Sequence, residues 1–320
     1  MKPSFFELVE DRIQLVEVRM RNESAHHHPD LQSVLSYLLS SGGKRIRPTV
    51  ALLTGGMLGA DEDPLLCLAA AVELRHTATL VHDDLIDGAL LRRGIPTLNA
   101  RWSPAATVLA GDYIFARAAV SAASTNSVEL MRVFSETLAT IVSGEITQLF
   151  TSRGTASRED YYRRIYAKTA SLFQTSTYCA ALLSPVDEPV LDAMKTFGYN
   201  LGMAFQIVDD ILDFTGEQAT VGKPVASDLR MGLVTLPAIY YAEKYPDDAD
   251  MQLVLNGVYN DEVAMPRLID SIRESGAVQQ AMDEAREFVA RGLEAISGLP
   301  ENAEHAALED LAAYIVDREV

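Results

Sequence analysis

The sequence has little cysteine and no pattern that is typical of a disulfide framework. Its two cysteines, Cys67 and Cys179, stand far apart in apolar stretches of the 320-residue chain. Their spacing matches neither a CxxC redox motif nor a zinc-binding arrangement. We therefore expect buried thiols in a reducing compartment, and the class of small disulfide-rich secreted proteins is excluded.

Positive charge is also scarce. The chain has 27 Lys and Arg against 45 Asp and Glu, which gives a formal net charge of -18. This excludes a general nucleic-acid binder, because phosphate backbones require a basic stripe that displaces their counterions. An anionic substrate must instead meet a local cluster of cations or a bound metal ion.

Neither a signal peptide nor a long uninterrupted apolar run is evident. Residues 1–20 carry acids within their apolar pattern, and the longest apolar run, near 104–123, is interrupted by Asp112 and Arg117. A run of that length cannot span a bilayer. We expect a cytoplasmic protein without a transmembrane segment, for which peripheral contact with a membrane stays open.

Strict alternation of apolar and polar residues, which is typical of strands, is missing. Apolar residues recur instead at helical spacing, as at Phe5, Val9, Ile13 and Val16. Gly, Pro and acidic residues interrupt this pattern at intervals, but no Pro/Gly/Ser-rich linker divides the chain. The sequence predicts an all-α bundle of about ten or more helices around a central apolar cavity, forming one domain over 1–320.

Two short segments share one acidic pattern, "LVHDDLID" at 80–87 and "QIVDDILD" at 206–213. In each, aspartates at i and i+4 lie one turn apart on a helix. Because apolar residues precede them, we expect each trio at a helix end, at the edge of the core. The two aspartate trios are Asp83, Asp84 and Asp87, and Asp209, Asp210 and Asp213.

Like charges one turn apart destabilise a helix, so a positive group should compensate each trio. Mg²⁺ is suited to this because it prefers oxygen ligands and is usually held by one or two carboxylates and substrate phosphates. One such motif alone is more often a solvated acidic face. Two copies, both beside apolar residues, make a metal site the better interpretation.

Cations stand near these carboxylates in the sequence. "GGKRIRP" at 42–48 offers Lys44, Arg45 and Arg47 after a flexible Gly pair, as in a phosphate-binding loop, although a solvated loop explains it equally well. Arg92 and Arg93 follow the first trio closely enough to share a ligand with it. Further candidates are His76, Lys168 and Lys223.

The ordered motifs "GGKRIRP", "ELRHTATLVHDDLIDGALLRRGIPT", "GDYIFARA", "GEITQL", "KTA", "FQIVDDILDFTG" and "GKPVASDL" resemble the trans-isoprenyl diphosphate synthase family. The resemblance runs from about residue 30 to 240. It implies antiparallel helices around a deep apolar cavity, usually in a homodimer. It also implies head-to-tail condensation of isopentenyl diphosphate with an allylic diphosphate, in which metals and cations stabilise the departing diphosphate.

The resemblance also implies a role for each candidate residue. The two aspartate trios bind the allylic diphosphate from two sides through Mg²⁺, with about three ions per active site. The cations on the allylic diphosphate are Arg92, Lys168 and Lys223. The residues that hold isopentenyl diphosphate are Lys44, Arg47, His76 and Arg93. The residues that line the reacting centre are Thr169 and Gln206.

Product length depends on the residues one turn deeper than Asp83, which are Ala78 and Thr79. In the family a bulky aromatic residue there closes the cavity early, whereas both residues here are small. We therefore expect an all-trans polyprenyl diphosphate longer than geranylgeranyl diphosphate. The alternative is a short-chain synthase in which Ala78 is only a helix-packing contact.

Two other functions remain open from the sequence. A terpene cyclase also needs a DDxxD motif, but the second trio and "GGKRIRP" argue against it. A non-catalytic subunit of a heteromeric synthase is the other alternative, because Leu233 stands where many members of the family have a lysine. Arg230 is the nearby cation that we expect to substitute for that lysine.

Overall fold

The computed structural model describes residues 4–22, 29–40, 43–92, 94–151, 154, 156–216 and 225–318. Nearly all regular structure in these ranges is helical, and the sheet found there has two short strands. The predicted all-α fold is therefore confirmed. The residues group into two compact units, and the single domain over 1–320 stays a prediction.

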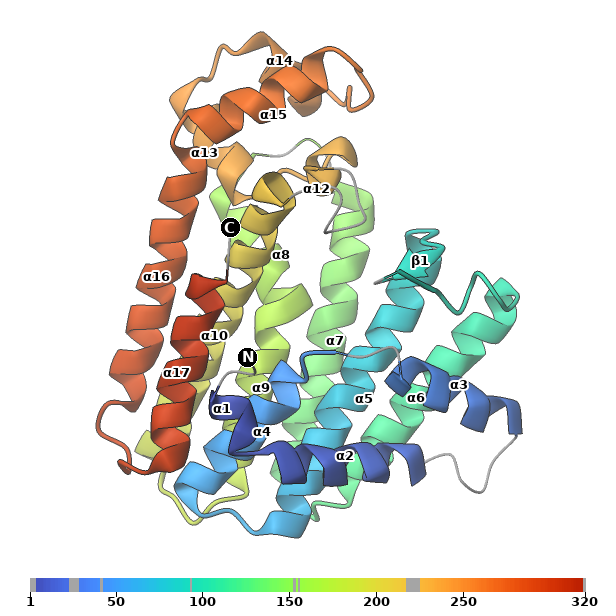
Figure 1. Cartoon of the computed structure of the whole chain (residues 1–320), viewed down its shortest axis with the longest axis vertical. Coiled ribbons are helices and arrows are strands. Elements are labelled where there is room, and N and C mark those ends of the chain that lie inside the picture. The colour runs from blue at the N-terminus through green and yellow to red at the C-terminus, as the bar shows by residue number, and fades with distance from the viewer. Residues whose placement is uncertain are drawn as a thin grey trace. The chain divides into compact units, whose positions relative to one another are not determined.

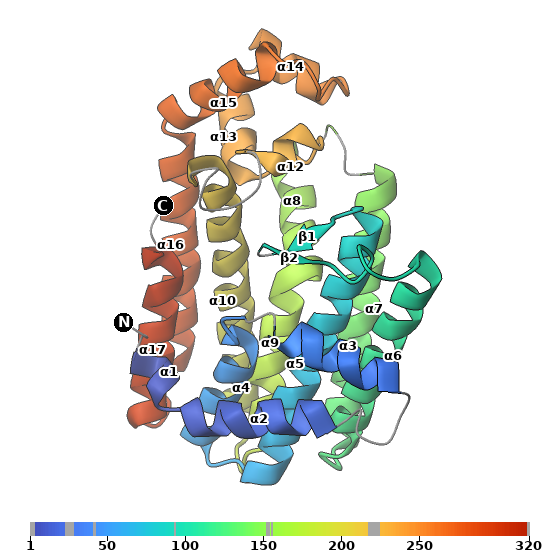
Figure 2. The same ribbon diagram turned by 45° about the vertical axis from the view of Figure 1, so that its right-hand side comes forward.

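The first unit comprises Met1–Glu136, Thr175–Lys195 and Gly298–Asp310. Its own elements are α1 (Ser4–Glu7), α2 (Glu10–Asn22), α3 (Pro29–Ser40), α4 (Ile46–Leu58), α5 (Glu62–Ile86), β1 (Leu91–Arg92), β2 (Ile95–Pro96) and α6 (Pro104–Ala123). Helix α5 packs most extensively against α6 and then against α4 and α2. Figures 1 and 2 show α2 crossing the lower part of α5.

Helix α5 is the central helix of the first unit. Its Leu- and Ala-rich stretch from Leu65 to Arg75 is buried without interruption. Among the described helices it alone is long and apolar enough to cross a membrane, but 72% of its most apolar window is buried within the protein. Gly111 permits the close approach of α6, since a Cβ there would lie 2.1 Å from the His82 ring.

The helix breaks fall where Gly, Pro and acidic residues cluster, as the sequence predicts. Helix α5 ends at Ile86, and Gly88 follows with a φ of 63°. The predicted break at "RRGIPT" is in fact an antiparallel hairpin in which Leu91 pairs with Pro96. Gly94, at a φ of 74°, permits this turn. Strands of two residues are too short to give an alternating pattern, so the sequence does not predict them.

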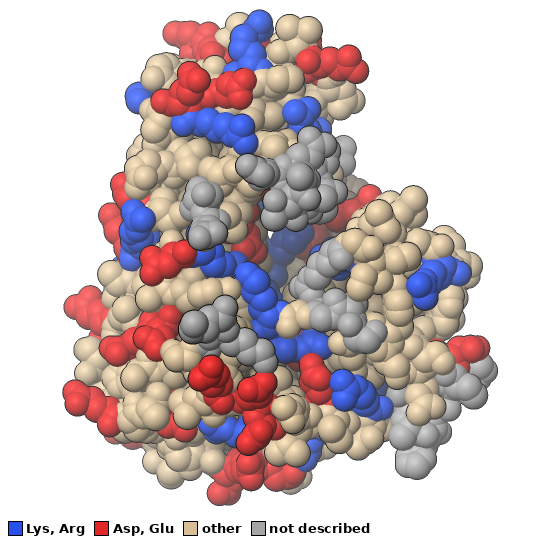
Figure 3. All heavy atoms as spheres, viewed as in Figure 1, with Lys and Arg blue, Asp and Glu red and all other residues tan. Residues whose placement is uncertain are grey.

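The second unit comprises Thr137–Gln174, Thr196–Ser297 and Leu311–Val320. Its own elements are α8 (Arg158–Ile165), the π-helix η1 (Tyr166–Ala170), α12 (Ser227–Arg230), α13 (Leu236–Lys244), α14 (Ala249–Leu255), α15 (Ala264–Glu274) and α16 (Ala277–Ile296). Helix α16 packs against α13 and α15. Figure 3 shows basic and acidic side chains together over α14 and α15, where Arg267 pairs with Asp250.

Four further helices contribute residues to both units. They are α7 (Val128–Thr151), α9 (Ser171–Leu182), α10 (Glu188–Thr215) and α17 (Ala303–Asp317). Helix α10 carries the second aspartate trio near its C-terminal end, as predicted from the apolar residues before it.

Candidate active site

The first aspartate trio lies at the C-terminal end of α5. Asp83 and Asp84 belong to its last turns, and Asp87 caps it. Asp83 is half-buried and Asp87 is exposed, whereas Asp84 is buried. Arg92 Nε donates to Asp84 Oδ1 over 2.8 Å, and Nη2 of the same side chain lies 2.8 Å from that oxygen. The β-hairpin that follows α5 thus brings a predicted cation onto a predicted carboxylate.

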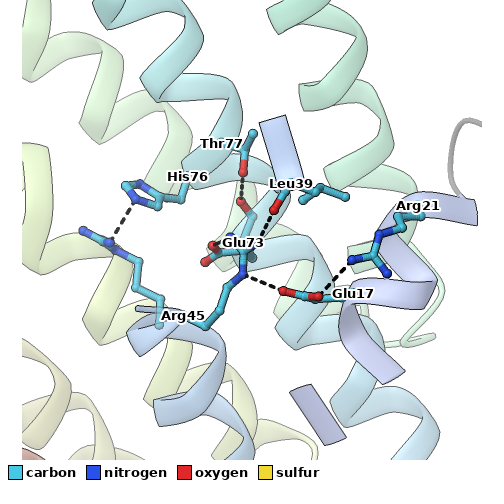
Figure 4. A network of polar contacts seen from close by, with 8 residues as sticks. Glu17, Arg21, Leu39, Arg45, Glu73, His76 and Thr77 are labelled. Atoms are coloured by element: carbon cyan, nitrogen blue, oxygen red, sulfur yellow. Dashed lines mark hydrogen bonds and ion pairs between the residues drawn. The ribbon is translucent and has the colours of Figure 1, made fainter. Parts of the chain in front are cut away.

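The start of α4 brings a second group of cations to α5. Arg47 Nη1 lies 3.3 Å from His76 Nε2, so these two predicted ligands of isopentenyl diphosphate are neighbours. Lys44, the third predicted residue of this set in the described chain, is exposed. Figure 4 shows the His76 ring joined by a dashed line to a guanidinium group on one side of the network around Arg45.

Two residues predicted for the reacting centre and one predicted metal ligand form one chain of hydrogen bonds with a tyrosine. Thr169 Oγ1 donates to Gln206 Oε1 over 2.6 Å, and Gln206 Nε2 donates to Asp210 Oδ1 over 2.8 Å. Tyr161 Oη donates to the other Asp210 oxygen over 2.8 Å. Burial raises the pKa of Asp210 to about 7, assisted by the charge of Asp228 and opposed by these two hydrogen bonds.

Asp213 is bound to the short helix α12. Its Oδ1 accepts from the backbone N–H and the hydroxyl of Ser227, over 3.1 and 2.8 Å. Its Oδ2 accepts from the backbone N–H of Asp228 over 3.1 Å. Ala226, the residue before Ser227, has a φ of 53°, a backbone conformation that residues other than glycine rarely adopt. The carboxylate that we predicted as a metal ligand therefore also holds the chain turn that starts α12.

Asp209 is bound by an arginine from the end of the chain. Arg318 Nη1 donates to Asp209 Oδ1 over 2.9 Å, and its guanidinium carbon lies 4.2 Å from the centre of the Phe205 ring. The Arg318 side chain is 8% exposed, whereas that of Asp209 is 39% exposed. Asp209 is therefore reachable by solvent although an arginine contacts it.

Lys168 lies in the π-helix η1 between α8 and α9. Its Nζ lies 3.5 Å from Glu145 Oε1 on α7. Such one-turn π segments are rare and occur often at functional sites. Within this turn the Lys168 side chain is exposed, whereas that of the next residue, Thr169, is buried.

The residues predicted to limit product length lie in the core of the first unit. Ala78 is fully buried. Thr79 is half-buried, and its hydroxyl donates to the His76 carbonyl over 2.8 Å. One turn earlier Arg75 is fully buried, donates to the Phe134 carbonyl, and stacks 3.4 Å above the Phe134 ring. Burial lowers the pKa of Arg75 to about 9.

The predicted residues divide between the two units. In the first unit are Lys44, Arg47, His76, Ala78, Thr79, Asp83, Asp84, Asp87 and Arg92. In the second unit are Lys168, Thr169, Gln206, Asp209, Asp210 and Asp213. Arg93 and Lys223 lie outside the described residues. Arg230, expected to replace the missing lysine, donates from Nε to the Val225 carbonyl over 3.0 Å.

The carboxylates suit a metal that is completed by its ligand. Within the ranges that the structure describes, no three His, Cys, Asp or Glu side chains are gathered to hold a metal by themselves. Mg²⁺ needs only one or two carboxylates when phosphate oxygens and waters complete its octahedron. Each unit by itself supplies hard oxygen donors of this kind, half-buried Asp83 and exposed Asp87 in the first and partly exposed Asp209 in the second. The residues present therefore fit Mg²⁺ bound together with a diphosphate.

Two partners of the site were missed from the sequence. Tyr161 is 49 residues from Asp210, and no local pattern links them. Glu73, which binds Arg45, could have been found from the sequence, because it stands three residues before His76 and therefore on the same face of α5. An acid buried in a Leu- and Ala-rich helix needs a cation, and Arg45 was the unassigned cation of "GGKRIRP".

A family model described as "Polyprenyl synthetase" matches residues 28–272. The chain belongs to this family. It is 36% identical over 317 residues to heptaprenyl diphosphate synthase component 2 of Geobacillus stearothermophilus, covering 99% of this chain and 98% of that relative. The predicted resemblance is thereby confirmed, and the chain is a polyprenyl diphosphate synthase that uses isoprenyl diphosphate substrates.

Solved structures of polyprenyl synthetase family members agree in fold. The chain is similar to heptaprenyl diphosphate synthase from Staphylococcus aureus, with a TM-score of 0.92 and 32% identity, covering 98% of this chain and 99% of that one. It is also similar to a polyprenyl synthase from Caulobacter crescentus complexed with calcium and isoprenyl diphosphate. The comparison with the Caulobacter crescentus protein gives a TM-score of 0.90 at 33% identity, and it covers 100% of this chain and 99% of that protein's chain.

Proposed function

We propose that this chain is a Mg²⁺-dependent prenyltransferase that condenses isopentenyl diphosphate onto an allylic diphosphate and makes an all-trans product longer than geranylgeranyl diphosphate. The observation that carries the proposal is that each aspartate trio lies at the end of an apolar helix with an arginine on one carboxylate. Such an arrangement suits an anionic ligand whose hydrocarbon part enters an apolar core. The relatives named for heptaprenyl products support the length.

The metal ligands in this proposal are the aspartates of both trios. Bound Mg²⁺ would neutralise the diphosphate that leaves as the allylic C–O bond ionises. Arg92 already contacts Asp84, so it lies where a diphosphate on the first trio would need a second cation. Lys168 and, beyond the described residues, Lys223 complete this set. The calcium and isoprenyl diphosphate in the Caulobacter crescentus protein support a divalent-metal site.

Lys44, Arg47, His76 and Arg93 would bind the diphosphate of isopentenyl diphosphate. The contact between Arg47 and His76 supports this assignment, because it holds a guanidinium and an imidazole 3.3 Å apart, where both side chains can reach one phosphate. In the second unit, Gln206 has its amide fixed by Thr169 on one side and Asp210 on the other. We propose that this fixed amide orients the reacting end of the allylic chain.

Ala78 and Thr79 would leave room for a long product. Ala78 has no side chain beyond Cβ, and the Thr79 hydroxyl is already bonded to the His76 carbonyl. The hydroxyl therefore needs no further partner, and the apolar side of Thr79 can contact hydrocarbon. Each further helical turn of clearance adds about 5.4 Å, or roughly one isoprene unit.

We also propose a cytoplasmic homodimer that contacts membranes only peripherally, for release of its product. Large apolar side chains are exposed on α6 and α7, among them Leu109 at 67% and Phe150 at 82%. Apolar surface of this kind marks sites of association with proteins or lipids. Light scattering of the purified protein, with and without lipid vesicles, tests both parts of this proposal.

A heteromeric enzyme, in which this chain is one of two different subunits, is suggested by the name of one relative. The relative called "component 2" belongs to a synthase with more than one component. This chain would then need a second, different subunit for activity. Turnover by the purified single chain separates the two arrangements, because a subunit of a two-chain enzyme is inactive alone.

The central experiment incubates the purified chain with farnesyl diphosphate, isopentenyl diphosphate and Mg²⁺, and sizes the dephosphorylated products by mass spectrometry. We expect products longer than geranylgeraniol. Ala78→Phe should shorten them without abolishing turnover, while Ala306→Phe, which adds the same ring on an exposed position of α17, should not. A wild-type product no longer than geranylgeraniol would refute the long-chain proposal.

A further inference from the structure

Arg45 occupies an unusual backbone position at the start of α4. It is the residue before Ile46, with a φ of 47° and a ψ of 32°. Only Asn126 and Ala226 share a positive φ among the other non-glycine residues that the structure describes. An arginine gains nothing from this left-handed conformation by itself, so contacts of its side chain must hold it there.

Those contacts reach three other helices of the first unit. Arg45 Nη1 donates to Glu73 on α5 over 2.6 Å, and Nε donates to Glu17 on α2 over 3.2 Å. Nη2 donates to the Leu39 carbonyl on α3 over 3.1 Å. Figure 4 shows these bonds diverging from one guanidinium group. Each of the three nitrogens is thus used to fix the point where the loop becomes α4.

The charges in this network are matched and largely removed from solvent. The side chains of Arg45 and Glu73 are 11% and 6% exposed. Burial by itself would lower the pKa of Arg45, but Glu73 and Glu17 outweigh it, and the pKa is raised. Arg45 therefore stays charged and bound to Glu73, which makes it unsuited to direct contact with a substrate.

The neighbouring residues carry the predicted diphosphate ligands. Arg47, two positions after Arg45, contacts His76. Glu73 and His76 are three residues apart and share one face of α5. The start of α4 is therefore attached to α5 at two points. Arg45 forms a buried ion pair with Glu73, and Arg47 forms a partly buried contact with His76.

We infer that Arg45 is a positioning residue, which holds the start of α4 against α5 so that Lys44, Arg47 and His76 are prearranged for the diphosphate of isopentenyl diphosphate. The inference rests on the proposed function of those three residues. Without the anchor, substrate binding would have to order the loop after Gly43, and that ordering would weaken affinity. Arg45 itself touches no substrate.

The test uses the full-length protein and two variants. Arg45→Met removes every hydrogen bond of the guanidinium, whereas Arg45→Asn removes the bond to Glu73 but tolerates the left-handed backbone. For both we expect the KM and the calorimetric Kd of isopentenyl diphosphate to rise by about tenfold or more. The KM of the allylic diphosphate and kcat at saturation should change by less than about twofold. Arg45→Lys should restore part of the affinity, since a lysine can still pair with Glu73.

The control is Arg21→Met. Arg21 also binds Glu17, over 3.0 Å, and this bond joins two residues one turn apart on α2. This variant should bind isopentenyl diphosphate like the wild type. If folded Arg45→Asn also binds like the wild type, or if both substrates lose affinity equally, the inference is overturned. A wild-type protein that binds no isopentenyl diphosphate would instead refute the proposed function. Should Arg45→Met not fold, Arg45→Lys and Arg45→Asn decide the question.

Discussion

The carboxylates at the end of α5 and those at the end of α10 have the same sequence spacing but different partners. At α5, Asp83 is half-buried, Asp87 is exposed, and an arginine of the hairpin binds Asp84. At α10, by contrast, Asp210 is bonded to Tyr161 and Gln206, and Asp213 is bonded to the start of α12. Two carboxylates of the second trio, Asp210 and Asp213, are therefore part of the local architecture, whereas Asp87 of the first trio is exposed.

One motif therefore serves two purposes in this chain. A carboxylate that accepts hydrogen bonds from backbone N–H groups stabilises the folded chain whether or not metal is bound. A carboxylate that faces solvent contributes little to folding and is available to an ion. Substitution of Asp83 or Asp87 should therefore lower activity more than stability, and substitution of Asp210 or Asp213 should lower both.

The largest expected effect is that of Asp83→Ala on turnover. Loss of one charge-stabilising group in an active site reduces kcat by about 10²- to 10³-fold. The free energy of unfolding should change by less than about 0.5 kcal/mol, because Asp83 is only half-buried. Steady-state kinetics and urea unfolding measure the two quantities. Glu62→Ala, at an exposed position on the first turn of the same helix, is the control and should affect neither.

The second prediction concerns Asp213→Ala, which removes three hydrogen bonds to α12. Because the acceptor is charged, we expect a loss of about 2–3 kcal/mol in the free energy of unfolding. Hydrogen exchange should accelerate at the backbone N–H groups of Ser227 and Asp228. Asp213→Asn keeps one acceptor oxygen and should lose less. Equal stability of Asp213→Ala and the wild type would show that the two trios do not differ in this way.

The sequence predicts the position of each trio but not its partners. Placement at helix ends follows from apolar residues before a DDxxD pattern. The sequence places Arg92 close enough to share a ligand with the first trio, but it does not predict that Arg92 binds Asp84 directly. Tyr161 and Arg318 lie 49 and 109 residues from the aspartates that they bind. Such contacts depend on how the helices pack, which a local pattern does not encode.

The same limit applies to the fold. Helical periodicity and Gly- and Pro-rich breaks predict the all-α class and most helix ends. The two-residue strands around Gly94 and the π-turn at Lys168 are too short to alter the period of the sequence. Both carry predicted site residues, since Arg92 lies on β1 and Lys168 on η1. The parts of the site that depart from regular helix are therefore the least predictable.

The third prediction is that Tyr161→Phe costs about 1–3 kcal/mol in the free energy of unfolding. The substitution keeps the buried ring but removes the hydroxyl that donates to Asp210, which is 4% exposed. Tyr162→Phe is the matched control, because the Tyr162 hydroxyl donates to Glu284 at a less buried position. Urea unfolding of both variants gives the comparison. A smaller loss for Tyr161→Phe than for Tyr162→Phe would contradict the structural role of the second trio.

The smallest expected effects come from the arginines that bind one carboxylate in each trio. Arg92→Met leaves Asp84, whose side chain is 9% exposed, without its cation, and should cost about 1 kcal/mol in unfolding free energy. Arg318→Met leaves Asp209, which is 39% exposed and can be hydrated, and should cost about 0.5 kcal/mol or less. Methionine preserves the apolar stem over Phe205, so packing is largely kept. The decisive measurement is which variant loses more stability. Asp84 is the more buried of the two carboxylates, whereas Arg318 is the more buried of the two arginines, so the two explanations predict opposite orders. The reverse order in urea unfolding would mean that the burial of the arginine decides the loss, and not the burial of the carboxylate left behind.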